Sequence, residues 1–231
     1  MSPPAAAEVI VALDVPTADA ALALARQLDP NGFYKVGLEL FTAAGPSVVD
    51  ALHDLGARVF LDLKLHDIPN TVAGAARSAA RLGVALLTVH GVGGEAMLRA
   101  AVDGAGERTG ILAVTVLTSM DAESLAAATG RPAVEVDAEV LRLAAVAAAA
   151  GAHGVVCSGY EVAAVRARHG DRLASLVPGI RMSGGAIGDQ RRVVTPRQAA
   201  EAGARYLVLG RAVTAAADPA AALAQIRRDL A

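Results

Sequence analysis

The segment from Phe60 to His90 reads FLDLKLHDIPNTVAGAARSAARLGVALLTVH and contains one complete strand–helix–strand unit. The apolar run at 59–63 predicts a buried strand, and the amphipathic, alanine-rich stretch at 72–82 predicts a helix. Gly83 follows that helix, where a left-handed glycine commonly ends one, and the apolar run 86–90 predicts the next strand. Strands of continuous apolar residues joined through a helix are typical of a parallel sheet that is covered on both faces.

The same alternation of strand and helix continues on either side of this unit. Further apolar runs predict strands at 9–13, 34–37, 111–116, 154–157, 176–177 and 206–209, and alanine-rich stretches predict helices at 18–28, 48–55, 138–150 and 196–202. About eight such units fit into the chain, which predicts a (β/α)8 TIM barrel. We expect one domain spanning residues 1–231. A doubly wound sheet would carry a glycine fingerprint after its first strand, whereas this strand ends in Asp14-Val-Pro.

Composition narrows the class of protein. The formal net charge of −2 comes without blocks of like charge, which argues against binding to nucleic acid or to a membrane surface. The single cysteine, Cys157, excludes an intramolecular disulfide and is typical of a reducing compartment. The first residues, MSPPAAAEV, lack the basic segment and apolar core of a signal peptide, and no apolar run is long enough to cross a membrane. These features predict a soluble cytoplasmic protein.

The densest group of polar residues is DLKLHD at 62–67. Because side chains two residues apart on a strand share a face, Asp62 and Lys64 are predicted to point the same way. Two opposite charges in an aliphatic strand are costly to bury without further partners, which Lys35 and Asp67 are placed to supply. In a barrel the segments after the strands line the reactive mouth, so this cluster is a candidate catalytic site. The alternative is an ordinary buried ion pair that stabilises the barrel.

A second candidate site would bind an anion. Gly210 and Arg211 follow the last predicted strand, and a helix is expected to begin near Ala212. Backbone N–H groups at a helix start and a guanidinium together bind phosphate, which barrels often hold after strands seven and eight. The glycine-rich segment MSGGAIGDQRR at 182–192 is either a flexible surface loop or a loop whose Gln190 and Arg192 close over the same phosphate. The alternative for Arg211 is a surface arginine near a helix end.

Other motifs of enzyme chemistry are missing from the sequence. It has no His, Cys, Asp and Glu set with structural zinc spacing, no P-loop and no GxSxG motif, so we expect no metal site. His90 ends a predicted strand and is either a ligand-binding residue or a hydrogen-bonded structural histidine.

The order of the motifs resembles that of the orotidine 5'-monophosphate decarboxylase family in its compact single-domain form. The matching segments cover nearly the whole chain and are VALDVP, FYKVGLELF, FLDLKLHDIPNTV, VTVLTSM, PGIRMS, GDQRRVVTP and LVLGRAVTAAADP. A DxKxxD motif alone is shared with related sugar-phosphate barrels. Its HDIPNT continuation, followed in order by the PGIR, DQxR and GR segments, is far more specific.

The resemblance implies an activity and a set of catalytic residues. The protein would convert orotidine 5'-monophosphate to uridine 5'-monophosphate in pyrimidine biosynthesis, without a cofactor. Lys64 would deliver a proton to C6 of the pyrimidine, and Asp62 would lie against the departing carboxylate. Lys35 and Asp67 would complete an alternating network of charges.

The resemblance also implies substrate contacts and an assembly. The implied contacts are Asp14 and Lys35 with the ribose, Thr118 with the base, and Arg181, Gln190, Gly210 and Arg211 with the phosphate. The implied assembly is a homodimer, in which Asp67, Ile68 and Thr71 reach the site of the neighbouring subunit.

Two other functions are compatible with parts of the pattern. One is a metal-dependent sugar-phosphate decarboxylase or aldolase on the same barrel, which would use Mg²⁺ and an enediolate. Activity that survives a chelator would exclude it. The other is a non-catalytic barrel that binds uridine 5'-monophosphate. The intact Asp62, Lys64 and Asp67 argue against it, because a binding protein has little use for so costly a charge cluster.

Overall fold

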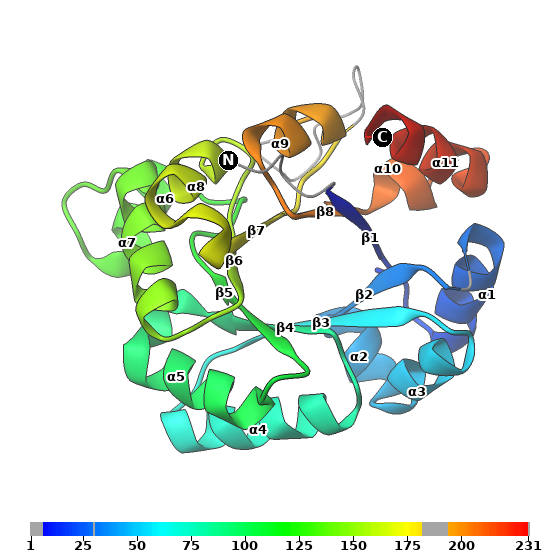
Figure 1. The fold of residues 1–231 in the computed structure, drawn as a ribbon, viewed down its shortest axis with the longest axis horizontal. Helices are drawn as coiled ribbons and strands as arrows, with labels where there is room; N and C mark the ends of the chain where they lie inside the picture. The colour runs from blue at the N-terminus through cyan, green and yellow to red at the C-terminus, as the bar shows by residue number, and fades with distance from the viewer. Residues whose placement is uncertain (1–6, 30, 182–193, 231) are drawn as a thin grey trace.

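Eight parallel strands of the described chain pair in sequence order, and the last pairs with the first, so the sheet closes into a barrel (Figure 1). The computed structural model describes residues 7–29, 31–181 and 194–230. The strands are β1 (Glu8–Ala12), β2 (Phe33–Gly37), β3 (Arg58–Leu65), β4 (Leu86–His90), β5 (Gly110–Val114), β6 (Gly154–Val156), β7 (Ala174–Val177) and β8 (Tyr206–Leu209). The predicted (β/α)8 barrel is confirmed.

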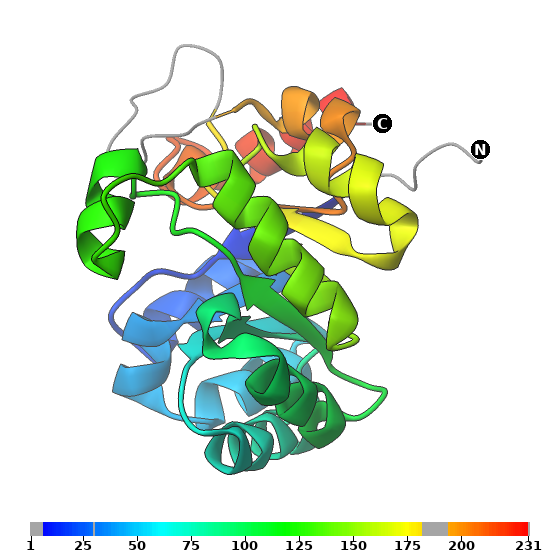
Figure 2. The same ribbon diagram turned by 90° about the vertical axis from the view of Figure 1, so that its left-hand side faces the viewer.

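Helices connect the strands and form an outer layer around the barrel (Figures 1 and 2). They are α1 (Ala18–Leu28), α2 (Leu38–Ala44), α3 (Ser47–Asp54), α4 (Pro69–Arg81), α5 (Gly94–Ala105), α6 (Ala122–Thr129), α7 (Val136–Ala149), α8 (Val162–His169), α9 (Pro196–Ala202), α10 (Arg211–Thr214) and α11 (Pro219–Leu230). The helices predicted at 18–28 and 196–202 have the predicted bounds, and the helix expected near Ala212 begins one residue earlier. Among the described residues, no helix combines the length and the apolarity that a membrane crossing requires.

Glycines with left-handed backbone lie between helices and the following strands, as the sequence predicts. The φ angles of Gly56, Gly83, Gly151 and Gly203 are 87°, 77°, 77° and 100°. A side chain is strained at such angles, so glycine is the residue that ends these helices at least cost.

Apolar side chains form two separate layers, one on each side of the sheet. The larger layer lies between the strands and the helices, where alanines from the helices meet strand residues such as Val36, Leu61 and Leu87. The smaller layer fills the barrel and comprises Ile10, Ala12, Phe33, Phe60, Leu86, Leu112, Leu176, Tyr206 and Val208. The barrel interior is therefore a packed floor rather than a pore.

The inward-facing positions change character toward the carboxyl ends of the strands. Since strand side chains alternate in direction, the inward residue after Phe33 is Lys35, and the one after Phe60 is Asp62. The same two-residue step from Ala12, the last residue of β1, leads to Asp14. The polar site thus lies directly on the apolar floor.

Candidate active site

A cavity of about 670 Å³ opens at the carboxyl ends of the strands. Its floor is apolar and includes Phe60, Val156 and Leu176. Eight residues predicted for the site line it, namely Asp14, Lys35, Asp62, Lys64, Thr118, Arg181, Gly210 and Arg211. Asp67, Ile68 and Thr71 do not line it, and Gln190 lies outside the described residues.

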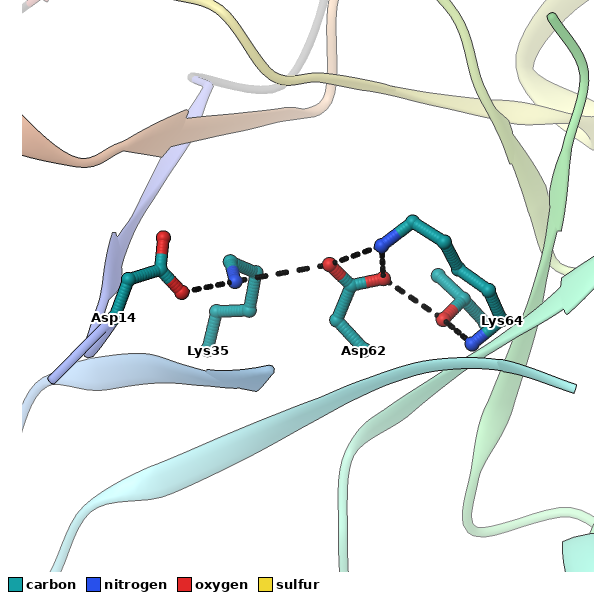
Figure 3. A network of polar contacts seen from close by, with 5 residues as sticks. Asp14, Lys35, Asp62 and Lys64 are labelled. Atoms are coloured by element: carbon teal, nitrogen blue, oxygen red, sulfur yellow. Dashed lines mark hydrogen bonds and ion pairs between the residues drawn. The ribbon is translucent and has the colours of Figure 1, made fainter. Parts of the chain in front are cut away.

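Four of these side chains form a row of alternating charge across the ends of β1, β2 and β3 (Figure 3). The Lys35 ammonium lies 2.7 Å from Asp14 Oδ1 and 3.7 Å from Asp62 Oδ2. The Lys64 ammonium donates to both carboxylate oxygens of Asp62 at 2.8 Å. Each charge therefore has an opposite neighbour, which is the condition under which the buried members of the row, Lys35 and Asp62, are tolerated.

The backbone of Lys64 brings its ammonium back to Asp62. Lys64 has φ of 50° and is the one non-glycine residue of the described chain with positive φ. That conformation costs a side-chain-bearing residue about 1–2 kcal/mol. Regular alternation along a strand predicted the shared face of Asp62 and Lys64, but the structure reaches it through an irregularity in β3.

This irregularity is a bulge against β4. The ladder pairs Leu61 with Leu87 and Leu65 with Val89, so residues 62–64 lie opposite the single residue Thr88. Bulges of this kind re-aim side chains and are frequent next to active sites.

Thr88 is a site residue that the sequence did not reveal. It is fully buried, and its hydroxyl donates to Asp62 Oδ1 while accepting from the backbone N–H of Lys64, both at 2.9 Å. The available signal was a hydroxyl inside the apolar run LLTVH, on the strand next to the charged cluster. That signal is weak, because threonine is common in strands.

Gly37 leaves the room that the Lys35–Asp14 ion pair needs. A Cβ at position 37 would lie 2.8 Å from Lys35 Nζ and 3.2 Å from Asp14 Oδ1. A side chain at position 37 would therefore displace the ends of both charged side chains and disturb their ion pair.

Two arginines provide positive charge on another part of the cavity wall. Arg211 is the first residue of α10, and Arg181 follows β7, with a guanidinium that donates to the carbonyl oxygen of Ile180 at 3.0 Å. Gly210 lies beside them, and a Cβ there would meet no atom within 4 Å. Guanidinium groups beside open space are suited to binding a phosphate.

The sequence contains two lysines, and both belong to the charge row. Every other permanently cationic side chain is an arginine. Arginine does not release its proton in proteins, whereas an ammonium is compact and is able to transfer one. The amines of this chain are therefore concentrated where a proton could be delivered.

Histidines lie beside the charge row without joining it. The rings of His66 and His90 have centroids 5.7 Å apart. Burial is the main cause that lowers the pKa of His90, and the nearby charges of His66 and Lys64 lower it further, so the ring is neutral at pH 7. Within the described residues, no three His, Cys, Asp or Glu side chains are grouped to hold a metal ion.

A (β/α)8 barrel whose carboxyl-end cavity combines an ammonium–carboxylate row with an arginine wall defines an enzyme for small anionic substrates. The chain belongs to the family described as "Orotidine 5'-phosphate decarboxylase / HUMPS family", whose model matches residues 7–226. The family resemblance of the sequence motifs is confirmed.

Similar proteins cover nearly the whole chain. An orotidine 5'-phosphate decarboxylase of Anaeromyxobacter sp. (strain K) is 56% identical over 225 residues, which are 96% of this chain and 97% of the relative. One from Halorhodospira halophila is 53% identical, and the matched region covers 100% of this chain and 99% of the relative. The crystal structure of orotidine 5'-phosphate decarboxylase from Lactobacillus acidophilus has a TM-score of 0.87 at 39% identity. The superposed region covers 97% of this chain and 99% of that chain.

Proposed function

We propose that this protein decarboxylates orotidine 5'-monophosphate to uridine 5'-monophosphate in pyrimidine biosynthesis. Relatives that are 56% and 53% identical over nearly the full chain are named orotidine 5'-phosphate decarboxylase. The observation that carries the proposal is the placement of the Asp62–Lys64 pair and Arg211 on the wall of one cavity. Such a cavity suits a substrate with a reacting carboxylate at one end and a phosphate at the other.

The reaction breaks the bond between C6 of the pyrimidine and its carboxylate. The electron pair stays on C6, carbon dioxide departs, and a proton from the Lys64 ammonium completes the product. No carbonyl next to C6 takes up the electron pair, so the site has to stabilise the developing charge electrostatically. We assign that task to the Lys64 ammonium, with Asp62 against the carboxylate and Lys35 holding Asp62. The residues would do so without a cofactor.

One contact cannot supply the whole effect. Two unit charges about 4 Å apart at an effective dielectric constant near 20 interact by about 4 kcal/mol. Enzymes lower barriers by about 8–23 kcal/mol, so further contributions are needed. A prearranged row of charges does not have to reorganise during the reaction, and binding energy from a remote phosphate can be used at the reacting centre.

The remaining substrate contacts are assigned as the family resemblance implies. We assign the phosphate to Arg181, Gln190, Gly210 and Arg211, the ribose to Asp14 and Lys35, and the base to Thr118. Closure around the phosphate would exclude water and press the substrate carboxylate toward Asp62.

We further propose a homodimer in which Asp67, Ile68 and Thr71 act in the neighbouring site. All three are exposed and lie outside the cavity of their own chain, and Ile68 is 66% exposed. The Asp67 carboxylate accepts the N–H of Ile68 at 2.6 Å. A large exposed apolar side chain beside a carboxylate supports contact with a partner surface.

The decisive assay follows orotidine 5'-monophosphate by absorbance in excess chelator. We expect wild-type protein to consume it, while Lys64→Ala and Lys64→Arg fold but lose nearly all turnover. Arginine keeps the charge but has no proton to give. Turnover that the chelator abolishes would favour the metal-dependent alternative, and binding of uridine 5'-monophosphate without turnover would favour the non-catalytic one. A folded Lys64→Ala protein with substantial turnover would make the proton-donor assignment wrong.

Mixing inactive variants tests the shared site. Mixed dimers of Lys64→Ala and Asp67→Ala would contain one intact site, so random exchange should restore about a quarter of wild-type activity. Lys64→Ala mixed with Asp62→Asn is the matched control, because both residues belong to the same chain's site and no intact site forms. Equal activity in the two mixtures would show that Asp67 does not cross to the partner.

A further inference from the structure

We infer that Thr88 is a positioning residue that sets the geometry of the Asp62–Lys64 pair. The inference rests on the proposed function, because it assumes that this pair carries the reaction. Thr88 does not line the cavity, so it would act through its two neighbours rather than on the substrate.

The bulge in β3 brings the Thr88 hydroxyl opposite residues that have no regular partner on β4. Three residues of β3 lie between the ladder pairs that flank Thr88 on β4, so the ladder has no regular partner for them. The N–H of Lys64 donates to Thr88 Oγ1 at 2.9 Å. The hydroxyl thus takes the role that a backbone carbonyl has in a regular sheet, and it stabilises Lys64 in its left-handed conformation.

The same oxygen fixes the carboxylate. Having accepted from Lys64, the hydroxyl directs its own hydrogen to Asp62 Oδ1 at 2.9 Å. One buried atom therefore determines where the Lys64 backbone turns and how the Asp62 carboxylate is rotated. The two chemical groups of the pair are tied to a common point on the neighbouring strand.

Threonine suits this task better than other hydroxyl residues. Its branched Cβ restricts the χ1 angle, so the oxygen has a defined direction inside the strand. Its exposed fraction is 0%, which excludes water as a ready substitute for the hydroxyl. Removing the hydroxyl takes a hydrogen-bond partner from the N–H of Lys64 and from the carboxylate oxygen Oδ1 of Asp62.

The variants for the test separate the hydroxyl from the volume of the side chain. Thr88→Val keeps the shape and removes the hydroxyl, and Thr88→Ser keeps the hydroxyl. Thr109→Val is the matched control, because Thr109 is also buried but donates to the carbonyl of Val84 at 2.7 Å, just before β5 and away from the cavity. We expect Thr88→Val to lower kcat roughly 10–100-fold, the effect of losing hydrogen bonds to charged groups. KM should change less than about 3-fold, because the proposed phosphate contacts are untouched.

A spectroscopic measurement tests the hydrogen bond without using activity. Protein labelled with ¹⁵N-lysine gives two backbone amide signals, from Lys35 and Lys64, because the chain has two lysines. In Thr88→Val we expect the Lys64 signal to shift and to exchange faster with solvent, while the Lys35 signal stays in place. Thr88→Ser should retain both signals and most of the turnover.

The outcomes separate this inference from the proposed function. A Thr88→Val protein with kcat within about 3-fold of wild type, or a Thr88→Ser protein as slow as Thr88→Val, overturns the positioning role. An unchanged Lys64 amide in Thr88→Val overturns it as well, even if the wild type proves inactive on orotidine 5'-monophosphate and the proposed function fails. Should Thr88→Val not fold, Thr88→Ala removes the same hydroxyl without steric conflict. Failure of both to fold assigns Thr88 to stability alone.

Discussion

Glycine should stabilise this protein at position 64 and destabilise it at position 35, relative to alanine in each case. Lys64 has left-handed backbone, with φ of 50°, whereas Lys35 lies in the regular strand β2 and has no positive φ. Both lysines contact Asp62, so truncation removes an ion pair at either position. Comparing alanine with glycine at one position cancels that loss and leaves the backbone contribution.

The magnitude follows from two known costs. A residue with Cβ pays about 1–2 kcal/mol for left-handed backbone, and glycine pays almost none of this. Glycine in a strand is less stable than alanine by about 0.5–1 kcal/mol, because it loses more conformational freedom on folding. Lys64→Gly should therefore be about 0.5–1 kcal/mol more stable than Lys64→Ala, and Lys35→Gly should be less stable than Lys35→Ala by a similar amount.

Denaturant unfolding of the four variants measures these differences, with one slope m imposed on all of them. The thermal midpoint gives a second measurement, in which a change of 1 kcal/mol corresponds to about 2–4 °C for a chain of this size. If glycine lowers stability at position 64 as much as at position 35, Lys64 does not have left-handed backbone. The bulge and the role inferred for Thr88 would then be wrong as well.

Three further predictions concern binding and pH. Arg211→Ala should lower kcat/KM for orotidine 5'-monophosphate by about 100-fold or more, but leave the rate with orotidine unchanged, since the lost contact is to the phosphate. The control Arg197→Ala removes an exposed arginine paired with Glu201 and should leave the kinetics unchanged. If kcat/KM of Arg211→Ala were close to that of the wild type, Arg211 would not be a phosphate-binding residue. Burial raises the pKa of Tyr34 to about 12. Its stabilising contribution of about 2–3 kcal/mol is therefore complete below pH 10 and is lost as pH rises toward 12, so Tyr34→Phe should flatten this decline in unfolding experiments. Burial lowers the pKa of His90, so the unfolded state binds its proton more tightly. Stability should decrease as pH falls below about 6.5, and His90→Gln should reduce that decrease; an unaltered pH profile would contradict the assignment.

The strands and several helices could be predicted because their signal is local. Apolar runs such as 206–209 and the amphipathic stretch at 18–28 coincide with β8 and α1, since each buries one face or one stripe wherever it packs. The carboxyl-end position of Asp62 and Arg211 follows from barrel geometry once the strands are known.

The role of Thr88 could not be predicted, because it depends on the pairing of two strands. Sequence alternation gives the face of a residue but not a register shift between β3 and β4. The left-handed backbone of Lys64 could not be predicted either, because lysine has no preference for that conformation. Asp67 differs from these residues, because it does not line the cavity of its own chain and the role that we propose for it in a partner's site rests on the family resemblance.

The closed barrel explains how such a row of charges stays in order. Asp14 follows β1, Lys35 and Asp62 lie on β2 and β3, and β4 contributes Thr88, so these three charged side chains are held by contacts to an element other than their own. Closure fixes the spacing of those strands through the apolar floor beneath them. The row of charges at the mouth is therefore in place once the barrel has folded, and in the mechanism that we propose the reaction does not have to bear the cost of arranging it.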